Sequence, residues 1–365
     1  MALITDKVLL NPKATASAPS STEGGLYYDS DEDALMSYGT SWQMVSKATA
    51  SGGTEWNSGG YKYHTFLTDG DFTISGGSLA VDVFMIGGGG GGGGARYGGG
   101  GGAGGLIWYP AASLTSQTCV IVIGAGGAGE GGDATILDKT NGVDTTMTRS
   151  IGNLTAKGGG WGASGDNTTT TYGLGNIGGC GGGGMNYNSG SDNFGTSNQS
   201  SQSGDSGTYG IGFSGGRGYG SANYDGGGGG GLSEAGVSAT NTSGGTDGRG
   251  GHGVHTLSGL SQAQTTAFLA AGAASQSEVV SSIRYIGAGG GAGGHDPVSA
   301  IGSGNRVPGG HGFGGDGGVQ GSKSAGLAAP ANSGSGGGSA VTNTSSNTQP
   351  GGAGGSGIVI IRYAL

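Results

Sequence analysis

Unbroken glycine runs constrain this chain more than any other feature of its sequence. Glycine fills 97 of the 365 positions and forms runs such as Gly87–Gly94 and Gly226–Gly231. Glycine loses more backbone entropy on folding than any other residue and has no side chain to bury. Such runs are therefore ordered only where backbone packs against backbone and the buried N–H and C=O groups find partners.

Two ordered forms of glycine-rich chain are extended helices with three residues per turn. Collagen requires glycine at every third position and abundant proline. This chain has 7 prolines, and its runs GGGG, GGGA and GGAGG keep no such register. The sequence therefore predicts a bundle of polyglycine II helices, in which each backbone bonds to its neighbours.

The charge balance excludes several classes of partner. With 14 Lys plus Arg against 23 Asp plus Glu the net charge is -9, so we expect no binding to nucleic acid. No apolar stretch approaches the ~18 residues of a membrane span, and we expect no membrane insertion.

Cys119 and Cys180 are too few for a disulfide scaffold and lie at no metal-site spacing. Buried thiols are the expectation for both.

The N-terminal segment has no secretory signal pattern. The rest of the chain is nevertheless rich in the Ser, Thr, Asn and Gly of exposed surfaces. A virion protein fits both observations, because it is assembled in the host cytoplasm and released by lysis.

Period-two alternation and apolar runs predict the strands. Residues 1–25 are expected to form an extended arm, and residues 24–45 a β-hairpin. A helix is predicted over 261–274 only, with Ser261 as its N-cap. The predicted strands are 61–67, 71–75, 79–86, 106–110, 118–123, 133–137 and 358–363.

Strands run directly into glycine in VDVFMIGGGGGGGG, VIVIGAGGAG and SSIRYIGAGGGAGG, and in reverse order in GGAGGSGIVIIRY. The fold class predicted is mainly β with a polyglycine II helix bundle. Residues 1–50 form an arm and hairpin for virion attachment or oligomerisation, and 51–87 an antiparallel β unit that leads into the body. Residues 88–365 form a glycine-rich sandwich with long exposed loops and a closing C-terminal strand.

No motif of enzyme chemistry survives inspection. Gly124, Gly126 and Gly129 have dinucleotide-loop spacing, but Gly131 and Gly132 leave no room for the helix that would hold a pyrophosphate. The acidic YDSDEDAL tract has neither the glycine nor the glutamate of a calcium loop. The five histidines lie in a strand or in polar glycine segments, and His252 and His255 are not expected to converge on a metal. We predict a non-enzyme without catalytic, cofactor or metal site.

Aromatic residues interrupt the polar segments between glycine runs. Rings flanked by Ser, Asn and Gly are typical of adaptable recognition loops, and function is expected on loops held by a stiff scaffold. The alternative is that these rings cap the glycine helices or fill a trimer interface. The receptor-contact candidates are Trp161, Tyr172, Tyr187, Phe194, Tyr209, Phe213, Tyr219 and Tyr224.

The pieces YHTFLTDGDFTISGG, VDVFMIGGGGGGGG and VIVIGAGGAG, with the ending GGAGGSGIVIIRY, resemble the glycine-rich domain of bacteriophage tail-fibre and related virion proteins over residues 55–365. GSGIVIIRY is the most specific part. LYYDSDEDALMSYGTSWQMV resembles a short hairpin module of phage fibres. The alternation of glycine runs and polar loops is similar to the fibre-tip adhesin of T-even-type phages.

These resemblances imply a homotrimeric virion fibre without cofactors, attached to other virion proteins through residues 1–50. Its loops would contact a bacterial surface receptor, either a polysaccharide or an outer-membrane protein. Three alternatives stay open: a head, neck or decoration fibre without specific receptor binding, an ice-binding polyglycine II protein, and a capsule depolymerase.

Overall fold

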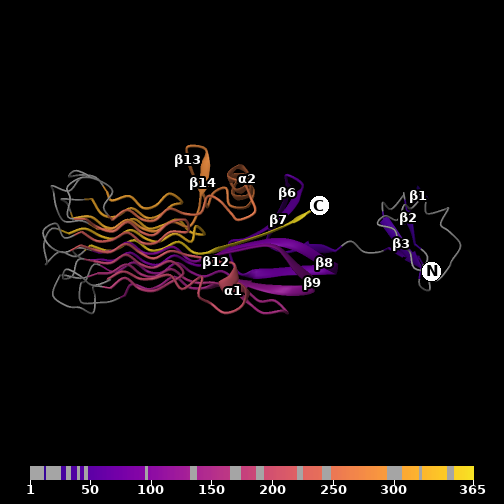
Figure 1. Ribbon diagram of the computed structural model, residues 1–365, viewed down its shortest axis with the longest axis horizontal. Helices are drawn as coiled ribbons and strands as arrows, with labels where there is room; N and C mark the ends of the chain where they lie inside the picture. Colours follow the sequence, from indigo (N-terminus) through magenta and orange to yellow (C-terminus); the bar gives the residue numbers. More distant parts are fainter. Residues whose placement is uncertain are drawn as a thin grey trace.

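The computed structural model describes 12–13, 26–29, 34–38, 42–44 and all of 48–365 apart from nine stretches. Residues 48–365 form an elongated body, with the long strands at one end and the glycine segments at the other (Figure 1). The nine stretches are 95–97, 132–137, 165–173, 186–192, 220–224, 241–247, 294–305, 320–322 and 343–348.

The N-terminal residues form a small sheet of their own. Its order is β1-β2-β3-β4, from β1 (Pro12–Lys13), β2 (Leu26–Asp29), β3 (Ala34–Tyr38) and β4 (Trp42–Met44). Strands β2 and β3 pair antiparallel with Tyr27 opposite Met36, which confirms the predicted hairpin. Two strands that the sequence did not predict extend it, since β1 joins β2 in parallel and β4 joins β3.

The main sheet draws its strands from distant parts of the chain. Its order is β11-β10-β9-β8-β15-β7-β6, with β12 on β9 and β5 on β8. The strands are β5 (Thr49–Ser51), β6 (Thr54–Ser58), β7 (Tyr61–Phe66), β8 (Gly70–Ile86), β9 (Leu106–Val122), β10 (Thr145–Met147), β11 (Leu154–Ala156), β12 (Gly210–Ile211) and β15 (Ile358–Ala364).

The closing strand β15 inserts between β7 and β8. Residues 358–363 are all buried, as expected for a near-continuous apolar run covered on both faces. The predictions of β7 and β15 are confirmed. Residues 51–87 therefore build their sheet jointly with 106–122 and 358–364.

The predictions of separate strands at 71–75 and 79–86, and at 106–110 and 118–123, were wrong. Each pair forms one long strand, β8 or β9, and the two long strands pair antiparallel with two irregularities. At one of them the Ser116 hydroxyl bonds both the N–H and the C=O of Gly77. At the other, the N–H of Ala111 donates to the Asp82 carboxylate at 3.0 Å. Side chains replace the missing ladder bonds, so the glycines and Pro110 act as bulges and not as turns. The predicted strand 133–137 lies outside the described residues.

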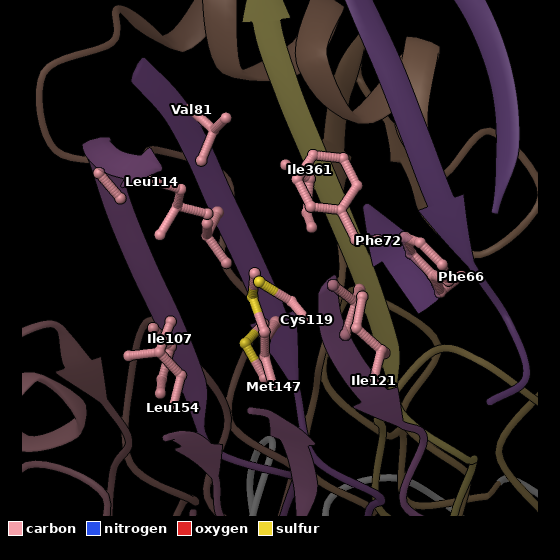
Figure 2. Close-up of a cluster of buried hydrophobic side chains, with 14 of the residues drawn as sticks. Phe66, Phe72, Val81, Ile107, Leu114, Cys119, Ile121, Met147, Leu154 and Ile361 are labelled. Carbon is pink, nitrogen blue, oxygen red and sulfur yellow. The ribbon is translucent and has the colours of Figure 1, made fainter. Parts of the chain in front are cut away.

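Alternate residues of the sheet fill two cores. Val83, Met85 and Ile361 belong to one cluster, shown in Figure 2 with Cys119 and Met147. Phe84 and Ile360 point to the opposite face and join the second cluster. Both cysteines are free and buried, as expected. Burial raises the pKa of the Cys119 thiol to about 11 and that of Cys180 to about 12.

Helix α2 (Gln262–Gly272) covers the second core, which confirms the predicted helix. The Ser261 side chain and Gln264 form a reciprocal capping box. Phe268 anchors the helix against Tyr63, Phe84 and Trp108, with ring centroids 5.5 to 6.0 Å apart. A short helix α1 (Asp205–Thr208) and the hairpin of β13 (Glu278–Val280) with β14 (Ile283–Tyr285) were not predicted. Among the described residues no helix is long and apolar enough to cross a membrane.

The glycine segments follow a hydrogen-bond period of three residues. Successive backbone N–H groups of residues 87–94 donate to three different segments, and the pattern repeats every three residues. Gly87, Gly90 and Gly93 donate to 99–105, Gly88 and Gly91 to 140–143, and Gly89 and Gly92 to 352–355. Carbonyls of the same segment accept from three further segments, 127–130, 159–162 and 337–340. Three residues per turn and no hydrogen bonds within the segment are the features of a polyproline-type helix, and on this ground we interpret the segments as polyglycine II helices.

Segment 98–105 has the same surroundings. It donates to 157–163, 227–230 and 334–337, and its carbonyls accept from 87–93, 180–183 and 290–293. A Cβ atom built on Gly101 would overlap the Gly90 backbone. Glycine is therefore needed at position 101 for close approach of the two backbones.

Candidate functional site

The described residues that flank the nine stretches meet at one end of the bundle, opposite the long strands (Figure 1). Gly94 donates to the Ser164 hydroxyl at 3.1 Å, although 70 residues separate them. Tyr219 pairs with Asp225, Arg306 with Val319, and Ser324 with Val341. The described residues on either side of the nine stretches therefore lie at this one end of the bundle, which we call the loop end.

Buried polar side chains close the glycine segments at the loop end. Lys139 and Glu130 form an ion pair at 3.1 Å with side chains only 3% and 2% exposed, and burial lowers the pKa of Lys139. The Asn193 amide donates to the Met185 carbonyl and accepts from the N–H of Gly218 at 3.1 Å. The Glu130 carboxylate, which accepts the N–H of Gly94 at 3.5 Å, and the Asn193 amide thus satisfy backbone groups at the ends of the glycine segments.

Three of the eight receptor-contact candidates, Tyr172, Tyr187 and Tyr224, belong to the nine stretches and lie outside the described residues. Tyr97 belongs to them too, and the prediction missed it. The signal was present, because Ala95, Arg96 and Tyr97 are the only interruption between Gly87–Gly94 and Gly98.

The five described candidates do not form one cluster. Phe194 and Tyr219 lie beside the loop end, where Phe194 follows Asn193 and Tyr219 is 37% exposed. Trp161 lies further inside the bundle and is partly buried. Its backbone N–H donates to the side-chain oxygen of Asn141.

Tyr209 and Phe213 lie at the other end of the body, which holds the long strands β8 and β9 and which we call the sheet end. Tyr209 stacks on Tyr109 of β9 with ring centroids 3.8 Å apart, and it packs against the first core. Phe213 follows β12, which pairs with the start of β9. The Tyr209 ring thus belongs to the packing of the sheet, whereas the Phe213 side chain is 38% exposed.

The dinucleotide-like spacing at Gly124, Gly126 and Gly129 lies in extended backbone without a helix. Gly129 packs against the backbone of Gly351, so no phosphate-binding helix terminus exists there. Of the acidic tract, Asp29 ends β2, and Asp31 and Asp33 lie outside the described residues. No group of three or more metal-ligating side chains occurs among the described residues.

His252 lies against a partner that the sequence did not indicate. Its ring stacks on that of His311 with centroids 4.4 Å apart, and His311 donates its backbone N–H to Nδ1 of His252. Burial, reinforced by the nearby Arg249 cation, lowers the pKa of His252 to about 4. His64 is buried in β7, where burial lowers its pKa. His295 lies outside the described residues.

Four outer segments carry exposed side chains in rows. Backbone bonds join 140–143 to 125–128, residues 124–130 to 351–357, and 350–353 to 326–329. Every third residue of these segments is exposed, so a three-residue register exists locally even though the chain has no collagen register. The exposed residues at this spacing are Thr140, Val143, Ala125, Ala128, Pro350, Ala353, Leu327 and Pro330, and Ala328 is exposed between the last two.

The family of the chain follows from comparison with known proteins. No curated protein matches it. A family model described as a glycine-rich domain matches residues 65–364, which include β8, β9, β15 and the whole bundle of glycine segments. The chain belongs to this glycine-rich domain family.

Proposed function

We propose that the chain is a receptor-binding fibre protein of a bacteriophage virion. The observation that carries the proposal is that the described residues flanking nine polar stretches lie at one end of a scaffold with backbone packed on backbone. A stiff body that holds the ends of many loop segments at one place suits a surface that recognises a partner without refolding.

The composition of the nine stretches supports recognition. They are rich in Ser, Thr, Asn and Gly, and they contain Tyr97, Tyr172, Tyr187 and Tyr224. Tyrosine gives a large contact area at low entropic cost, and small polar residues adapt their hydrogen bonds. The partner in this proposal is a polysaccharide or an outer-membrane protein of the bacterial surface.

In this proposal the chain is attached to the virion at the end of the body opposite the loop end. Residues 1–50 attach the chain to other virion proteins or to two further copies in a homotrimer. Light scattering of the full chain tests the oligomer, since a trimer gives three times the mass of one chain.

Exchange of residues 163–225 between related phages tests receptor binding. The proposal predicts a changed host range, because this region carries three of the stretches and Tyr172, Tyr187 and Tyr224. Exchange of residues 148–153, which join β10 to β11 at the sheet end, is the matched control and should change nothing. An unchanged host range in the first exchange favours a head, neck or decoration fibre.

The exposed rows of the outer segments favour a second candidate, an ice-binding protein. Alanines and Thr140 repeat there every three residues, about 9.3 Å along a polyproline-type helix. A thermal hysteresis assay decides: the fibre proposal predicts none, and a positive result that Ala128→Lys abolishes would replace it. Incubation with host capsule and an assay for reducing ends addresses the depolymerase alternative, and the fibre proposal predicts no release.

A further inference from the structure

A hollow of about 230 Å³ lies between helix α2 and the β6–β7 hairpin. It is at the sheet end, on the side of the body that α2 covers (Figure 1). Tyr61 supplies aromatic surface above the buried rings of Tyr63 and Phe268, which are 3% and 0% exposed. Ser58, Gln264 and Arg362 supply polar atoms. Apolar walls with a few convergent polar groups are typical of small-molecule sites.

Arg362 is held rigidly in this hollow. Its Nε donates to Asp82 at 2.8 Å and its Nη1 to the Tyr63 hydroxyl at 3.3 Å. The guanidinium lies 4.3 Å from the centroid of the Tyr61 ring and 4.9 Å from that of Phe268. Nη2 has no partner among the described residues, so an oriented donor remains for a ligand.

Gln264 provides a second oriented donor on the opposite wall. Its Oε1 accepts the N–H of Ser261 at 2.8 Å as part of the capping box. The capping box thereby fixes the orientation of the Gln264 amide. The NH₂ group of this amide faces the exposed side. The Ser58 hydroxyl, which both donates and accepts, completes the rim.

The charges of the side chains around the hollow favour a neutral, polar ligand. The Arg362 cation is already compensated by Asp82, whose other oxygen is taken by Ala111. Among the residues that the structure describes, no other cationic side chain lines the hollow, and the whole chain carries a net charge of -9. An anionic ligand gains little there, and a purely apolar one would leave the two donors unpaired.

We propose that this hollow binds a neutral pyranose of a saccharide. The C–H face of the ring would pack on the aromatic surface, and its hydroxyls would accept from Arg362 and Gln264. This site lies apart from the loop end and does not depend on the proposed receptor contacts.

Saturation-transfer NMR with the full chain tests the proposal. The probes are the methyl pyranosides of glucose, mannose and galactose, with glucuronic acid as the charged comparison. We expect transfer to at least one neutral pyranoside and weaker transfer to glucuronic acid. Absence of transfer to all three, or preference for the acid, overturns the assignment.

The variant Gln264→Glu separates recognition from folding. Glutamate keeps the capping box but loses the amide donor, so the affinity should fall about tenfold while the helix remains. Gln262→Glu is the matched control, because it adds the same charge to the same helix and Gln262 does not line the hollow. Equal losses in both variants contradict the site.

A triple change of Tyr172, Tyr187 and Tyr224 to serine distinguishes this site from the loop end. The pyranoside signal should be unchanged in that variant. Its loss would assign the saccharide to the loops and remove the hollow from the account.

Discussion

Gly91→Ala should destabilise the chain strongly, whereas Gly94→Ala should not. The two glycines are three residues apart in one segment, and a Cβ on either would point at the segment 124–131. At Gly91 the new atom would overlap the Ala128 carbonyl and lie 2.8 Å from the Gly129 nitrogen. At Gly94 it would meet the Glu130 side chain at 3.0 and 3.1 Å, and a side chain can move aside.

The cost at Gly91 follows from the hydrogen bonds between these two segments. Because the new atom must clear the Ala128 carbonyl, an ordinary contact of about 3.5 Å requires the two segments to separate by more than about 1 Å. The bonds from Gly127 to Gly89 and from Glu130 to Gly92, now 2.8 and 3.1 Å, would then exceed normal N–H···O lengths. Two lost bonds at about 1 kcal/mol each and about 1–3 kcal/mol of overpacking outweigh the ~0.4–1 kcal/mol that alanine gains through the unfolded chain. The net loss is about 3 kcal/mol.

Urea unfolding of the two variants measures this difference. At a slope of about 3 kcal/mol per molar, the midpoint of Gly91→Ala should fall by about 1 M. That of Gly94→Ala should change by less than about 0.3 M on the same slope. Equal midpoints would refute the argument, because the bundle would then not depend on backbone contact.

Three further predictions concern the core, the loop end and pH. Phe268→Ala should cost about 3–5 kcal/mol in urea unfolding, because this ring joins α2 to Tyr63, Phe84 and Trp108; a loss below about 1 kcal/mol would contradict that role. Lys139→Met should cost about 3–5 kcal/mol, because it leaves the Glu130 carboxylate buried and unpaired. Adding Glu130→Leu to this variant should restore most of the stability. No recovery in the double variant would argue against a desolvated ion pair. Burial lowers the pKa values of His64 and His252, so both stay neutral in the folded chain while the unfolded chain takes up protons below about pH 6.5. The free energy of unfolding should therefore fall between pH 6.5 and 4, and His64→Gln should flatten that slope; an unchanged slope would show that His64 does not contribute.

Local signals were sufficient for some elements and not for others. Alternation and apolar content located β7 and β15, and Ser261 as the N-cap located α2. The order of the main sheet was not predictable locally, because β15 reaches its place between β7 and β8 only through long-range pairing. The sequence prediction interrupted β8 at Gly76 and Gly77 and ended a strand at Pro110, because local chemistry does not reveal a partner strand that supplies Ser116 or Asp82.

The candidate site was predictable in kind but not in membership. Composition indicated that function lies between the glycine runs. It did not tell the ends of the bundle apart, so Tyr209 and Phe213 were grouped with rings at the opposite end. The exposed alanines at Ala125 and Ala128 were a usable signal, since a residue with a side chain at every third place marks an outer segment. His252 and His311 are 59 residues apart, and no local pattern joins them.

Amide hydrogen exchange tests the central claim most directly, namely that the glycine segments are held by bonds to their neighbours. Gly89–Gly92 and Gly100–Gly104 lie outside every helix and strand, yet each of their amides has a backbone acceptor in another segment. The account predicts protection of these amides comparable to that of β8 and β9. Exchange at the rate of an unstructured chain would contradict it.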